Sequence, residues 1–389
     1  MRVVILSTDP GIAFGGPKGA AVHLAEVAGA LAHRGAAVLL LVAGIAPMAR
    51  APAGVTLERL PGPDKASARE RLLGEATLRR WLEPRLRAFR ADALYERLAL
   101  HTAAGASAAA RLSIPYLVEL NAPLPMEAAT YRTLDEPDAA ERLECATLTA
   151  ADRVFAVSRP LATYACARGA GSVEVMPNAV AIDRYPERAG FGARASIDAD
   201  GHRPRAVFVG SLRPWHGIGT IAQAWEELGP SAPELIVVGD GPGRDRLAAI
   251  GASAIGSVDH EAVPGLLARA DIGIAPYASD APDYFSPLKL FEYLASGLAV
   301  IAGAIPGVTD VLTPETAWLI PPGDATALAN GVRTLVADPV LRSSLGRAGR
   351  ALVLEQHTWD RRAERVIAVI EELARAKRTA SFAPVGVGA

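Results

Sequence analysis

The chain has 389 residues, 50% of them hydrophobic, and a formal net charge of −2. This length is generous for one domain and comfortable for two of roughly 180 residues each. A net charge close to zero gives no global reason to expect nucleic acid as a partner. Cys145 and Cys166 are the two cysteines, and they lie in no metal-binding or redox spacing, which favours a reducing cytosol.

Signals for export or membrane insertion are not evident in the sequence. The chain opens directly on an apolar strand, with no charged region and apolar stretch ahead of a cleavage site. No apolar run reaches the roughly 18–20 residues that would span a bilayer. We therefore expect a cytoplasmic protein.

The first half of the chain alternates between apolar strands and helices. The strand Arg2–Ser7 is followed by a glycine-rich loop over 11–19 and a helix over Ala20–His33. Further strands are predicted at Ala37–Val42, Ala93–Tyr95, Tyr116–Leu120, Val154–Val157 and Val173–Met176. Continuous apolar runs between helices indicate a parallel, doubly wound sheet, whose ligands bind beyond the carboxyl ends of its strands.

A basic helical segment, Arg69–Arg90, interrupts this alternation. It holds seven arginines and three glutamates, with apolar residues at helical spacing and Pro84 expected to break the helix. A basic amphipathic helix can rest on an anionic membrane surface, which would allow peripheral membrane contact. The alternative is an ordinary apolar stripe that packs on the sheet.

The second half repeats the α/β alternation after a segment, Asp183–Pro204, that is rich in glycine, alanine and charge. Strands are predicted at Ala206–Val209, Leu235–Val238, Ala254–Ile255, Ile272–Ala275, Ala299–Ala302 and Ala317–Ile320. The later helices are predicted at Leu288–Ala295, Ala325–Ala337, Val340–Glu355 and Thr358–Lys377. This series predicts a second parallel sheet.

The segment Ser286–Gly303 carries the most chemical information. Ser286 is a favoured N-cap residue and Pro287 suits the first position of the helix that follows. A strand, a loop and then a helix leave free N–H groups that favour an anion such as phosphate. Lys289 adds a positive charge in the first turn, and Glu292 can accept hydrogen bonds from paired hydroxyls such as those of a ribose. The pattern suggests a nucleotide sugar.

Here the chain resembles the retaining GT-B glycosyltransferases of family 4, the group 1 glycosyltransferases. Their mark is a glutamate, seven residues and a second glutamate, then a small-residue helix end and a glycine before an apolar strand. Glu292 and the residues up to Gly297 match the second half, whereas Tyr284 stands at the first glutamate position. The form YFSPLKLFEYLASG resembles a sub-pattern of the family, so we interpret the change as a variant.

The resemblance implies a GT-B fold, an α/β architecture of two Rossmann-like doubly wound parallel-sheet domains that face each other across a cleft. Residues 1–183 would form the N-terminal acceptor-binding domain and 205–357 the C-terminal nucleotide-sugar-binding domain. Residues 184–204 would link them, 358–377 would form a helix that crosses back to the first domain, and 378–389 would be a disordered tail. The oligomeric state is left open.

It also implies the reaction. A sugar would move from a UDP- or GDP-linked donor to a hydroxyl of a small-molecule, glycan or lipid-linked acceptor, with retention by front-face displacement. The leaving phosphate would take the acceptor proton, so electrostatic stabilisation of the diphosphate carries the rate. No metal and no other cofactor is expected. Asp198 and Asp200 imitate a metal-holding pair, but no apolar strand leads into them.

Donor contacts are expected mainly in the second domain. Ser211 and His216 stand where the family has an Arg and a Lys that clamp the diphosphate, and Arg213 could restore one charge. The alternative is that Arg213 pairs with a surface carboxylate. The donor-binding candidates are Gly15, Gly16, Lys18, Arg213, His216, Val258, Pro287, Leu288, Lys289 and Glu292. The donor-sugar candidates are Asp283, Tyr284, Phe285 and Ser286.

Catalytic and acceptor contacts are expected partly at the strand ends of the first domain. Asn121 takes the place of a histidine that faces the transferred sugar in the family, and Glu119 points to the same face of its strand. Both residues also admit a purely structural role. The catalytic candidates are Asn121, Glu119, Arg213 and Lys289, and the acceptor candidates are His23, Glu96, Glu119 and Asn121.

Two other functions stay open on the same fold. One is a sugar-nucleotide epimerase or a pseudo-glycosyltransferase, which would form a non-glycosidic bond. The other is a catalytically silent subunit that binds nucleotide. Tyr284 and Ser211 keep both alternatives open, whereas Lys289 and Glu292 argue against a silent subunit.

Overall fold

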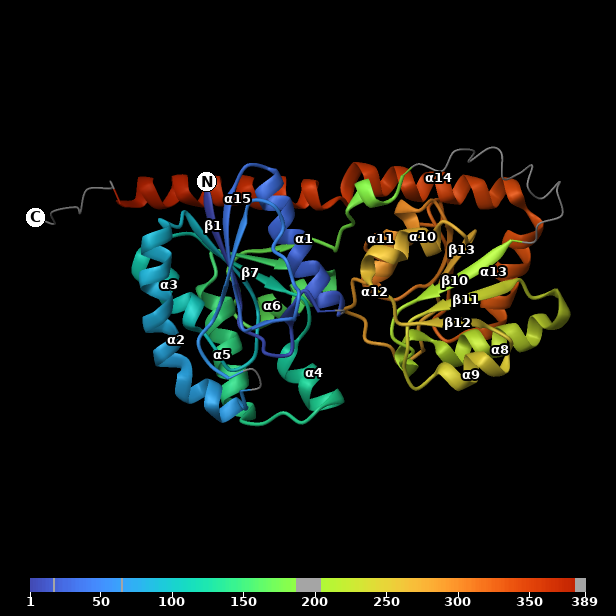
Figure 1. Ribbon diagram of the computed structural model, residues 1–389, viewed down its shortest axis with the longest axis horizontal. Helices are drawn as coiled ribbons and strands as arrows, with labels where there is room; N and C mark the ends of the chain where they lie inside the picture. The colour runs from blue at the N-terminus through green and yellow to red at the C-terminus, as the bar shows by residue number, and fades with distance from the viewer. Residues whose placement is uncertain (17, 64–65, 187–203, 382–389) are drawn as a thin grey trace, which may run out of the picture. The chain divides into compact units, whose positions relative to one another are not determined.

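The computed structural model describes residues 1–16, 18–63, 66–186 and 204–381 (Figure 1). The chain divides into two compact units, one of Met1–Met176 together with the helix that begins at Trp359, and one of Pro177–Thr358. The division thus falls after Met176 and not after Asp183, the boundary expected from the sequence. Most of the predicted linker, 187–203, lies outside the described residues, as do Asp198 and Asp200.

The first unit is built on one parallel sheet of seven strands. Its order is β5 (Val55–Arg59), β3 (Ala37–Val42), β1 (Arg2–Ser7), β6 (Ala93–Arg97), β7 (Tyr116–Leu120), β8 (Arg153–Ala156) and β9 (Val173–Val175). The chain winds outward from β1 in one direction and from β6 in the other, so the sheet is doubly wound as predicted. The direction reverses between β1 and β6, where a ligand crevice is expected in such sheets.

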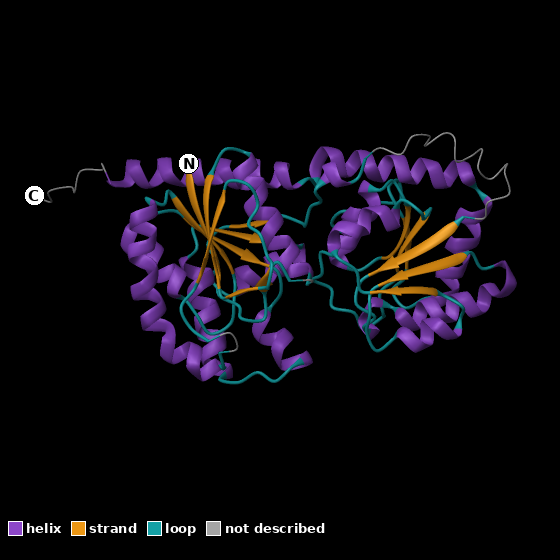
Figure 2. Cartoon of the chain, in the orientation of Figure 1, coloured by secondary structure: helices purple, strands orange, loops and turns teal. Residues whose placement is uncertain are grey.

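Helices cover both faces of this sheet (Figure 2). They are α1 (Gly19–His33), α2 (Ala68–Phe89), α3 (Ala104–Leu112), α4 (Leu124–Tyr131), α5 (Pro137–Ala150), α6 (Arg159–Ala167) and α15 (Trp359–Ser381). A small parallel pair, β2 (Ala13–Phe14) and β4 (Gly44–Ile45), lies in the loops after β1 and β3.

Two sequence expectations about these helices are wrong. α2 continues through Pro84, because its neighbours Leu82 and Leu86 are buried and hold the helix on the unit despite the lost backbone hydrogen bond. α15 continues to Ser381, so Arg378 is helical and does not begin a tail.

The second unit repeats the topology with six parallel strands. The order is β12 (Ser253–Gly256), β11 (Glu234–Val238), β10 (Arg205–Val209), β13 (Ile272–Ala275), β14 (Ala299–Gly303) and β15 (Trp318–Ile320). The direction of winding reverses between β10 and β13. Its helices are α8 (Ile218–Leu228), α9 (Arg244–Ala249), α10 (Val263–Leu267), α11 (Leu288–Ala295), α12 (Pro306–Thr309), α13 (Ala325–Ala337) and α14 (Pro339–Gln356).

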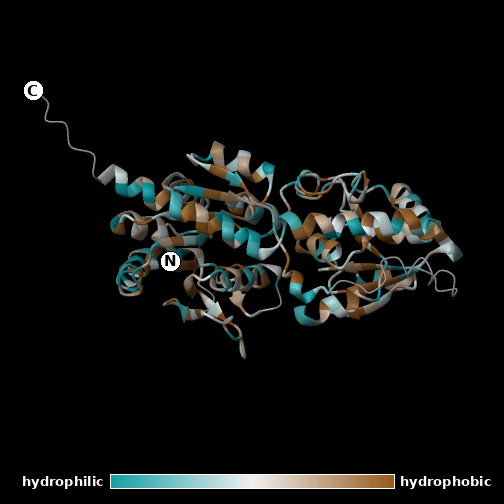
Figure 3. Cartoon of the chain, turned by 90° about the horizontal axis from the view of Figure 1, so that it is seen from above, coloured by the Kyte–Doolittle hydropathy of each residue, from teal (hydrophilic) through white to brown (hydrophobic). Residues whose placement is uncertain are grey.

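Successive residues of β10 pack into two separate hydrophobic cores, one on each face of the sheet. Val207 packs on one face with residues of α11 and α14. Phe208 packs on the other face with residues of α8 and α13. Figure 3 shows hydrophobic and hydrophilic residues interspersed along the helices. Within the described part of the chain, no helix combines the length and the apolar character needed to cross a bilayer.

Candidate functional site

Two loops touch at the carboxyl edge of the second sheet, one after β10 and one after β11. Leu212 donates its N–H to the Asp240 carbonyl at 3.0 Å. A Cβ on Gly239 would lie 2.0 Å from the Gly210 carbonyl oxygen, and Gly239 has φ near +132°. Only glycine permits this approach. This contact fixes the backbone at Gly210, and the side chain of Lys289 lies beside that glycine.

Lys289 is a buried cation at this edge. Its side chain comes from the first turn of α11, is 8% exposed, and holds Nζ 4.2 Å from the Phe208 ring centroid. A Cβ on Gly210 would lie 2.8 Å from that Nζ, so the ammonium rests against the glycine. Nζ has no hydrogen-bond partner among the described residues. Burial lowers the pKa of Lys289 to about 7, with Glu292 opposing the shift. An anion at this position would restore the ammonium's favourable charge interactions.

The start of α11 differs by one residue from the sequence expectation. Pro287, and not Ser286, is the N-cap, and the helix begins at Leu288. The Ser286 hydroxyl instead accepts a hydrogen bond from the Asn178 N–H at 2.9 Å, and the Asn178 amide donates to the Ser286 carbonyl. Ser286 therefore anchors the loop ahead of α11. The Leu290 N–H donates to the Pro287 carbonyl at 3.2 Å, so the N–H groups that a ligand could use are those that precede it in the first turn.

Glu292 lies one turn further along and is 6% exposed. Its Oε1 is 2.6 Å from His260 Nε2, and the other ring nitrogen of His260 is 3.2 Å from the Arg184 guanidinium. Sequence reasoning missed His260, because it is 32 positions from Glu292 and forms no local motif with it. To bind the hydroxyls of a ligand, Glu292 would have to share its contact with His260 or give it up.

The loop after β10 holds two further donor-binding candidates that could carry a positive charge, His216 and Arg213. His216 Nδ1 lies 2.6 Å from the Ser211 carbonyl, to which it must donate. Burial, with smaller contributions from the charges of Lys289 and Arg213, lowers the pKa of His216 to about 3, so His216 carries no charge at neutral pH. Arg213 is exposed and lies 5.7 Å from the Trp215 ring. The loop therefore offers one surface guanidinium beside the buried ammonium.

The donor-sugar candidates lie in the loop before α11. Tyr284 is 6% exposed and meets Phe285 edge-on, with ring centroids 5.2 Å apart. Asp283 is exposed, and its carbonyl accepts from the Gly307 N–H at 3.1 Å. The tyrosine at the family's glutamate position thus packs into the protein and supplies no carboxylate. Val258 packs against the core of this unit.

In the first unit, Glu119 is the centre of a buried polar cluster. Its carboxylate lies 2.6 Å from His23 Nε2, 3.1 Å from Arg97 and 3.0 Å from Arg362. The Tyr95 hydroxyl and the Asn121 amide also donate to it. Burial by itself would raise the pKa of Glu119, but His23, Arg362 and Arg97 hold it well below its usual range. Burial also lowers the pKa of His23, and the charge and hydrogen bond of Glu119 oppose that shift.

This cluster changes the roles expected from the sequence. Glu119 and Asn121 share one face of the strand, as predicted, since the amide donates to the carboxylate. Glu119 is only 1% exposed and His23 only 3%, and the side chains of both contact protein neighbours. Asn121 is partly exposed, and of these three residues it is the one able to face a ligand.

Glu96 also departs from the sequence expectation of an acceptor contact. It is fully buried, and the Tyr116 hydroxyl donates to its Oε2 at 2.6 Å. A Cβ on Gly105 would lie 1.8 Å from the same oxygen. Burial raises the pKa of Glu96 to about 8. The carboxyl is therefore a protonated core group, and its placement argues against contact with an acceptor.

The glycine-rich loop after β1 is described except for Pro17. Gly15 has φ near +76°, and a Cβ there would lie 2.4 Å from the Ala49 Cβ. Lys18 donates from Nζ to the Gly11 carbonyl at 2.8 Å and is exposed at the start of α1. Gly16 closes a turn onto the Ala13 carbonyl. The loop is a tight turn with one exposed cation, Lys18, which leaves its donor-binding role open.

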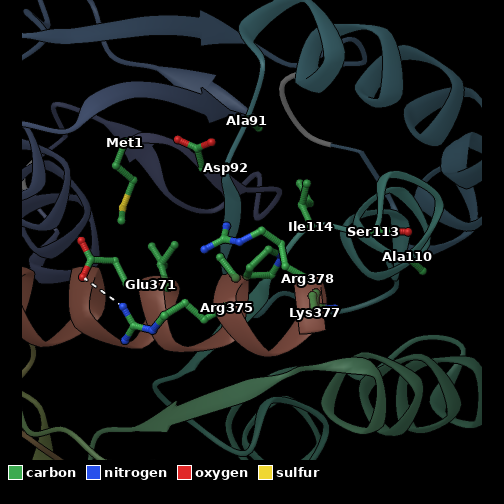
Figure 4. A pocket seen from close by; sticks show the side chains of 13 residues that line it. Met1, Ala91, Asp92, Ala110, Ser113, Ile114, Glu371, Arg375, Lys377 and Arg378 are labelled. Carbon is green, nitrogen blue, oxygen red and sulfur yellow. Dashed lines mark ion pairs between the residues drawn. The ribbon is translucent and has the colours of Figure 1, made fainter. Parts of the chain in front are cut away.

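A cavity of about 970 Å³ lies at the opposite edge of the first sheet, against α15 (Figure 4). Met1 and Asp92 line one side, before β1 and β6, and basic residues of α15 line the other. Two of these cations are paired, Lys377 with Asp152 at 3.0 Å and Arg375 with Glu371 at 4.0 Å. Ligands of such sheets bind at the carboxyl edge, so this hollow is a poor candidate for the site.

No group of three or more potential metal ligands occurs among the described residues. The arrangement at α11 offers an anion a buried ammonium, an exposed guanidinium and helix N–H groups. The two units thus have the form of a double Rossmann-like protein with a candidate anion site in the second.

Comparisons with known proteins agree with this class. A family model described as "Glycosyl transferases group 1" matches residues 203–338, and one described as "Glycosyltransferase Family 4" matches residues 17–184. The GDP-mannose-dependent alpha-(1-6)-phosphatidylinositol monomannoside mannosyltransferase of Mycolicibacterium smegmatis is 30% identical over 237 residues, which cover 56% of this chain and 61% of that protein. The chain spans 45%, 61% and 45% of the length of three curated relatives that it matches.

Solved structures share the fold over almost the whole chain. Sucrose-phosphate synthase from Thermosynechococcus elongatus gives a TM-score of 0.74 at 21% identity, covering 96% of this chain and 99% of that chain. Anabaena HepE in complex with UDP gives 0.69 at 16% identity, covering 96% and 100%. The fold is therefore GT-B, and the family models and relatives support a group 1 glycosyltransferase.

The protonated state of Glu96 predicts a specific pH dependence of stability. The folded protein holds this proton up to pH about 8, whereas the unfolded chain releases it near 4.5. The unfolded state binds fewer protons in that window, so the free energy of unfolding should fall as the pH rises through it. Glu96→Gln keeps an acceptor for Tyr116 and should flatten this fall by up to about 1.4 kcal/mol per pH unit.

Urea unfolding of both proteins between about pH 5 and pH 8 measures the difference. Glu226→Gln, at an exposed position of α8, is the matched control and should run parallel to the parent. Parallel curves for Glu96→Gln as well would mean that Glu96 is ionised in the folded protein.

Proposed function

We propose that the protein is a retaining glycosyltransferase that moves a sugar from a nucleoside-diphosphate sugar to a hydroxyl acceptor. The single observation that carries the proposal is Lys289, a buried ammonium without a hydrogen-bond partner among the described residues, at the start of α11 and beside Gly210. A donor diphosphate would supply the missing negative charge. The family models that match both halves of the chain support the reaction class.

In this mechanism the protein binds and stabilises, and the substrate supplies the base. Lys289, Arg213 and the first N–H groups of α11 would stabilise the charge that develops on the leaving diphosphate. The diphosphate would take the proton of the acceptor hydroxyl as that oxygen attacks the same face of the sugar, so that configuration is retained. Glu292 would accept hydrogen bonds from the ribose hydroxyls. No protein nucleophile is needed.

The nucleotide base is taken as uracil or guanine. The mycolicibacterial relative is named as GDP-mannose-dependent, and the HepE structure contains UDP. The acceptor is proposed to be a small-molecule, glycan or lipid-linked hydroxyl, and transfer to take place in the cytoplasm or at the inner face of the membrane. A thermal-shift screen with UDP, GDP and their sugars ranks the donors, because ligand binding to the folded state raises stability.

Lys289→Ala and Glu292→Ala should each weaken nucleotide binding without unfolding the protein. Losing a charge-assisted contact costs on the order of 1.5–3 kcal/mol, roughly ten- to a hundred-fold in affinity. Calorimetric titration with UDP and GDP measures the loss. Glu226→Ala, on the exposed face of α8, is the control and should bind as the parent does. Parent-like binding by both site variants would place the nucleotide elsewhere.

Transfer should survive removal of divalent metal, because the proposed diphosphate contacts are all cations and N–H groups of the chain itself. Release of nucleoside diphosphate from a radiolabelled sugar nucleotide, with and without EDTA, measures this. Loss of activity in EDTA and its rescue by manganese would contradict the proposal and direct attention to Asp198 and Asp200.

A second possibility on the same fold is an epimerase, a pseudo-glycosyltransferase or a silent nucleotide-binding subunit. The buried Tyr284 favours it, because no carboxylate faces the donor sugar from that position. The same radiolabel assay separates these functions. A glycosyltransferase or a pseudo-glycosyltransferase releases nucleoside diphosphate in an acceptor-dependent manner, an epimerase interconverts the sugar nucleotides, and a silent subunit does neither. The two transferases differ in the bond of the product, glycosidic in the first and non-glycosidic in the second.

Peripheral membrane contact through α2 is proposed as part of the same function (Figure 1). The exposed residues Arg69, Leu73, Arg80 and Arg87 fall on one helical face, and Leu73 is 75% exposed. The helix carboxylates Glu75 and Glu83 are engaged elsewhere, with Thr102 and Arg111. This face therefore carries positive charge around an apolar residue, which suits an anionic bilayer.

Arg80→Glu combined with Arg87→Glu should reduce binding to anionic phosphatidylglycerol vesicles in cosedimentation. Each lost arginine contributes roughly 1 kcal/mol, about fivefold in partitioning, and added salt should weaken the parent in the same direction. Arg347→Glu, exposed on α14, is the control for charge reversal alone. Equal binding to anionic and neutral vesicles would rule out the contact.

A further inference from the structure

A series of hydrogen-bonded side chains ends on Glu292, the residue proposed to accept the ribose hydroxyls. His260 Nε2 lies 2.6 Å from Glu292 Oε1, and the Arg184 guanidinium lies 3.2 Å from His260 Nδ1. Arg184 ends the 3₁₀ turn η1 (Ile182–Arg184), His260 begins the 3₁₀ turn η5 (His260–Ala262), and Glu292 lies in α11. These three side chains, from three separate elements of the second unit, form one hydrogen-bonded relay.

The direction of each hydrogen bond in the relay follows from its arginine. A guanidinium can only donate, so His260 Nδ1 must accept and the ring hydrogen lies on Nε2. Nε2–H then donates to Glu292 Oε1. Because the acceptor is a carboxylate, this bond is charge-assisted, and bonds of that kind are roughly twice as strong as those between neutral groups.

The Glu292 carboxylate depends on this one hydrogen bond. The residue is 6% exposed, and burying a carboxylate without a partner is costly. Among the described residues, His260 is the partner of Oε1 and Oε2 has none. The Lys289 ammonium, one turn earlier in α11, forms no hydrogen bond to it. His260 therefore holds one oxygen of the carboxylate and leaves the other open.

Binding of a ribose does not require the relay to break. A carboxylate has about four acceptor positions on its two oxygens. The His260 N–H occupies one position on Oε1, so Oε2 and the remaining position of Oε1 can accept from two neighbouring hydroxyls. A carboxylate that is already held in place also loses less conformational freedom when a ligand arrives, which favours binding.

A second histidine–carboxylate pair provides a contrast on the surface of the first unit. His33 Nδ1 lies 3.0 Å from Asp360 Oδ1, and these side chains are 69% and 40% exposed. The side chains of His260 and Glu292 are only 28% and 9% exposed. Exposed pairs contribute little, because solvent screens them. The His33 pair is thus a matched control for the removal of an imidazole from a carboxylate.

We propose that His260 is a positioning residue for ribose recognition. It holds Glu292 with Oε2 open to the ribose hydroxyls, and Arg184 maintains the tautomer of His260 that makes this possible. In taking the ligand as a nucleotide the inference rests on the proposed function, whereas the relay is present in the protein without ligand. Selectivity for a nucleotide with ribose hydroxyls then depends on a histidine 32 positions before the carboxylate.

The tautomer of His260 is measured first, on the protein without ligand. Long-range proton–nitrogen NMR of a histidine-labelled sample distinguishes the two ring nitrogens, and His260→Gln identifies the signals of His260. The Nε2–H form should predominate in the parent. Arg184→Met removes the donor to Nδ1 and should make the Nδ1–H form detectable. Another predominant form in the parent, or an unchanged ratio in Arg184→Met, would overturn the relay.

Calorimetry then compares UDP and GDP with analogues that lack both ribose hydroxyls. The parent should bind the ribonucleotide more tightly, because only that ligand has hydroxyls for Glu292. His260→Phe keeps a ring without the donor, and it should weaken the ribonucleotide about tenfold while changing the dideoxy analogue less than about twofold. His260→Gln supplies an amide N–H and should recover most of the loss. His33→Phe should bind both ligands as the parent does.

A double-mutant cycle tests whether His260 acts through Glu292. In the Glu292→Ala background, His260→Phe should cause no further loss, since the contact that it supports is already absent. A further loss there would overturn the inference, as would equal losses for both ligands or no loss in His260→Phe. A His260→Gln variant as weak as His260→Phe would do the same.

Failure of the parent to bind either nucleotide has a different meaning from these outcomes. It would refute the proposed function and, with it, the ribose role of His260. The tautomer measurement needs no nucleotide, so it still decides whether Arg184 and His260 hold the Glu292 carboxylate.

Discussion

The candidate site depends on one constraint, the cost of a buried charge without a partner. Lys289 is held in place by the core packing of α11 and by the close approach of the loops at Gly210 and Gly239. Its ammonium faces an aromatic ring and a glycine, and burial lowers its pKa to about 7. Under the proposed function, the diphosphate of the donor would offset the cost of this buried charge. The second unit would then gain stability from its ligand rather than from an internal ion pair.

In the first unit, by contrast, a buried charge is compensated by partners within the protein. Glu119 is even more buried than Lys289, yet two guanidiniums, a histidine, a phenol and an amide surround it. Such a carboxylate has no need of a ligand, and removing one partner would leave a buried charge uncompensated. Arg362, from the last helix, is one of these partners. The cluster thus joins α15 to β7 and orients Asn121 at the strand end.

Local sequence patterns predicted most of the fold and part of the site. Tyr116–Leu120 and Ile272–Ala275 were predicted with the bounds observed, because buried parallel strands are continuous apolar runs. Val55–Arg59 was missed, since this edge strand mixes polar and apolar residues and is only partly buried. Lys289 and Glu292 were predicted from the sequence pattern of a helix start. His260 and Asn178 contact the site from distant parts of the sequence, so no local pattern indicates them. The burial of Glu96 could not be foreseen either, because it depends on the approach of Gly105 on α3.

Three of the buried polar groups without a hydrogen-bond partner among the described residues lie where the winding of a sheet reverses. Lys289 follows β13 and rests beside the end of β10, where the second sheet reverses its winding. Thr8 follows β1 and His101 follows β6, where the first sheet reverses. At this point adjacent loops diverge and leave a crevice that side chains do not fill. The second unit presents a buried cation at this point, whereas the first presents a hydroxyl and an imidazole whose pKa burial lowers. The same topological position therefore carries different electrostatic character in the two units.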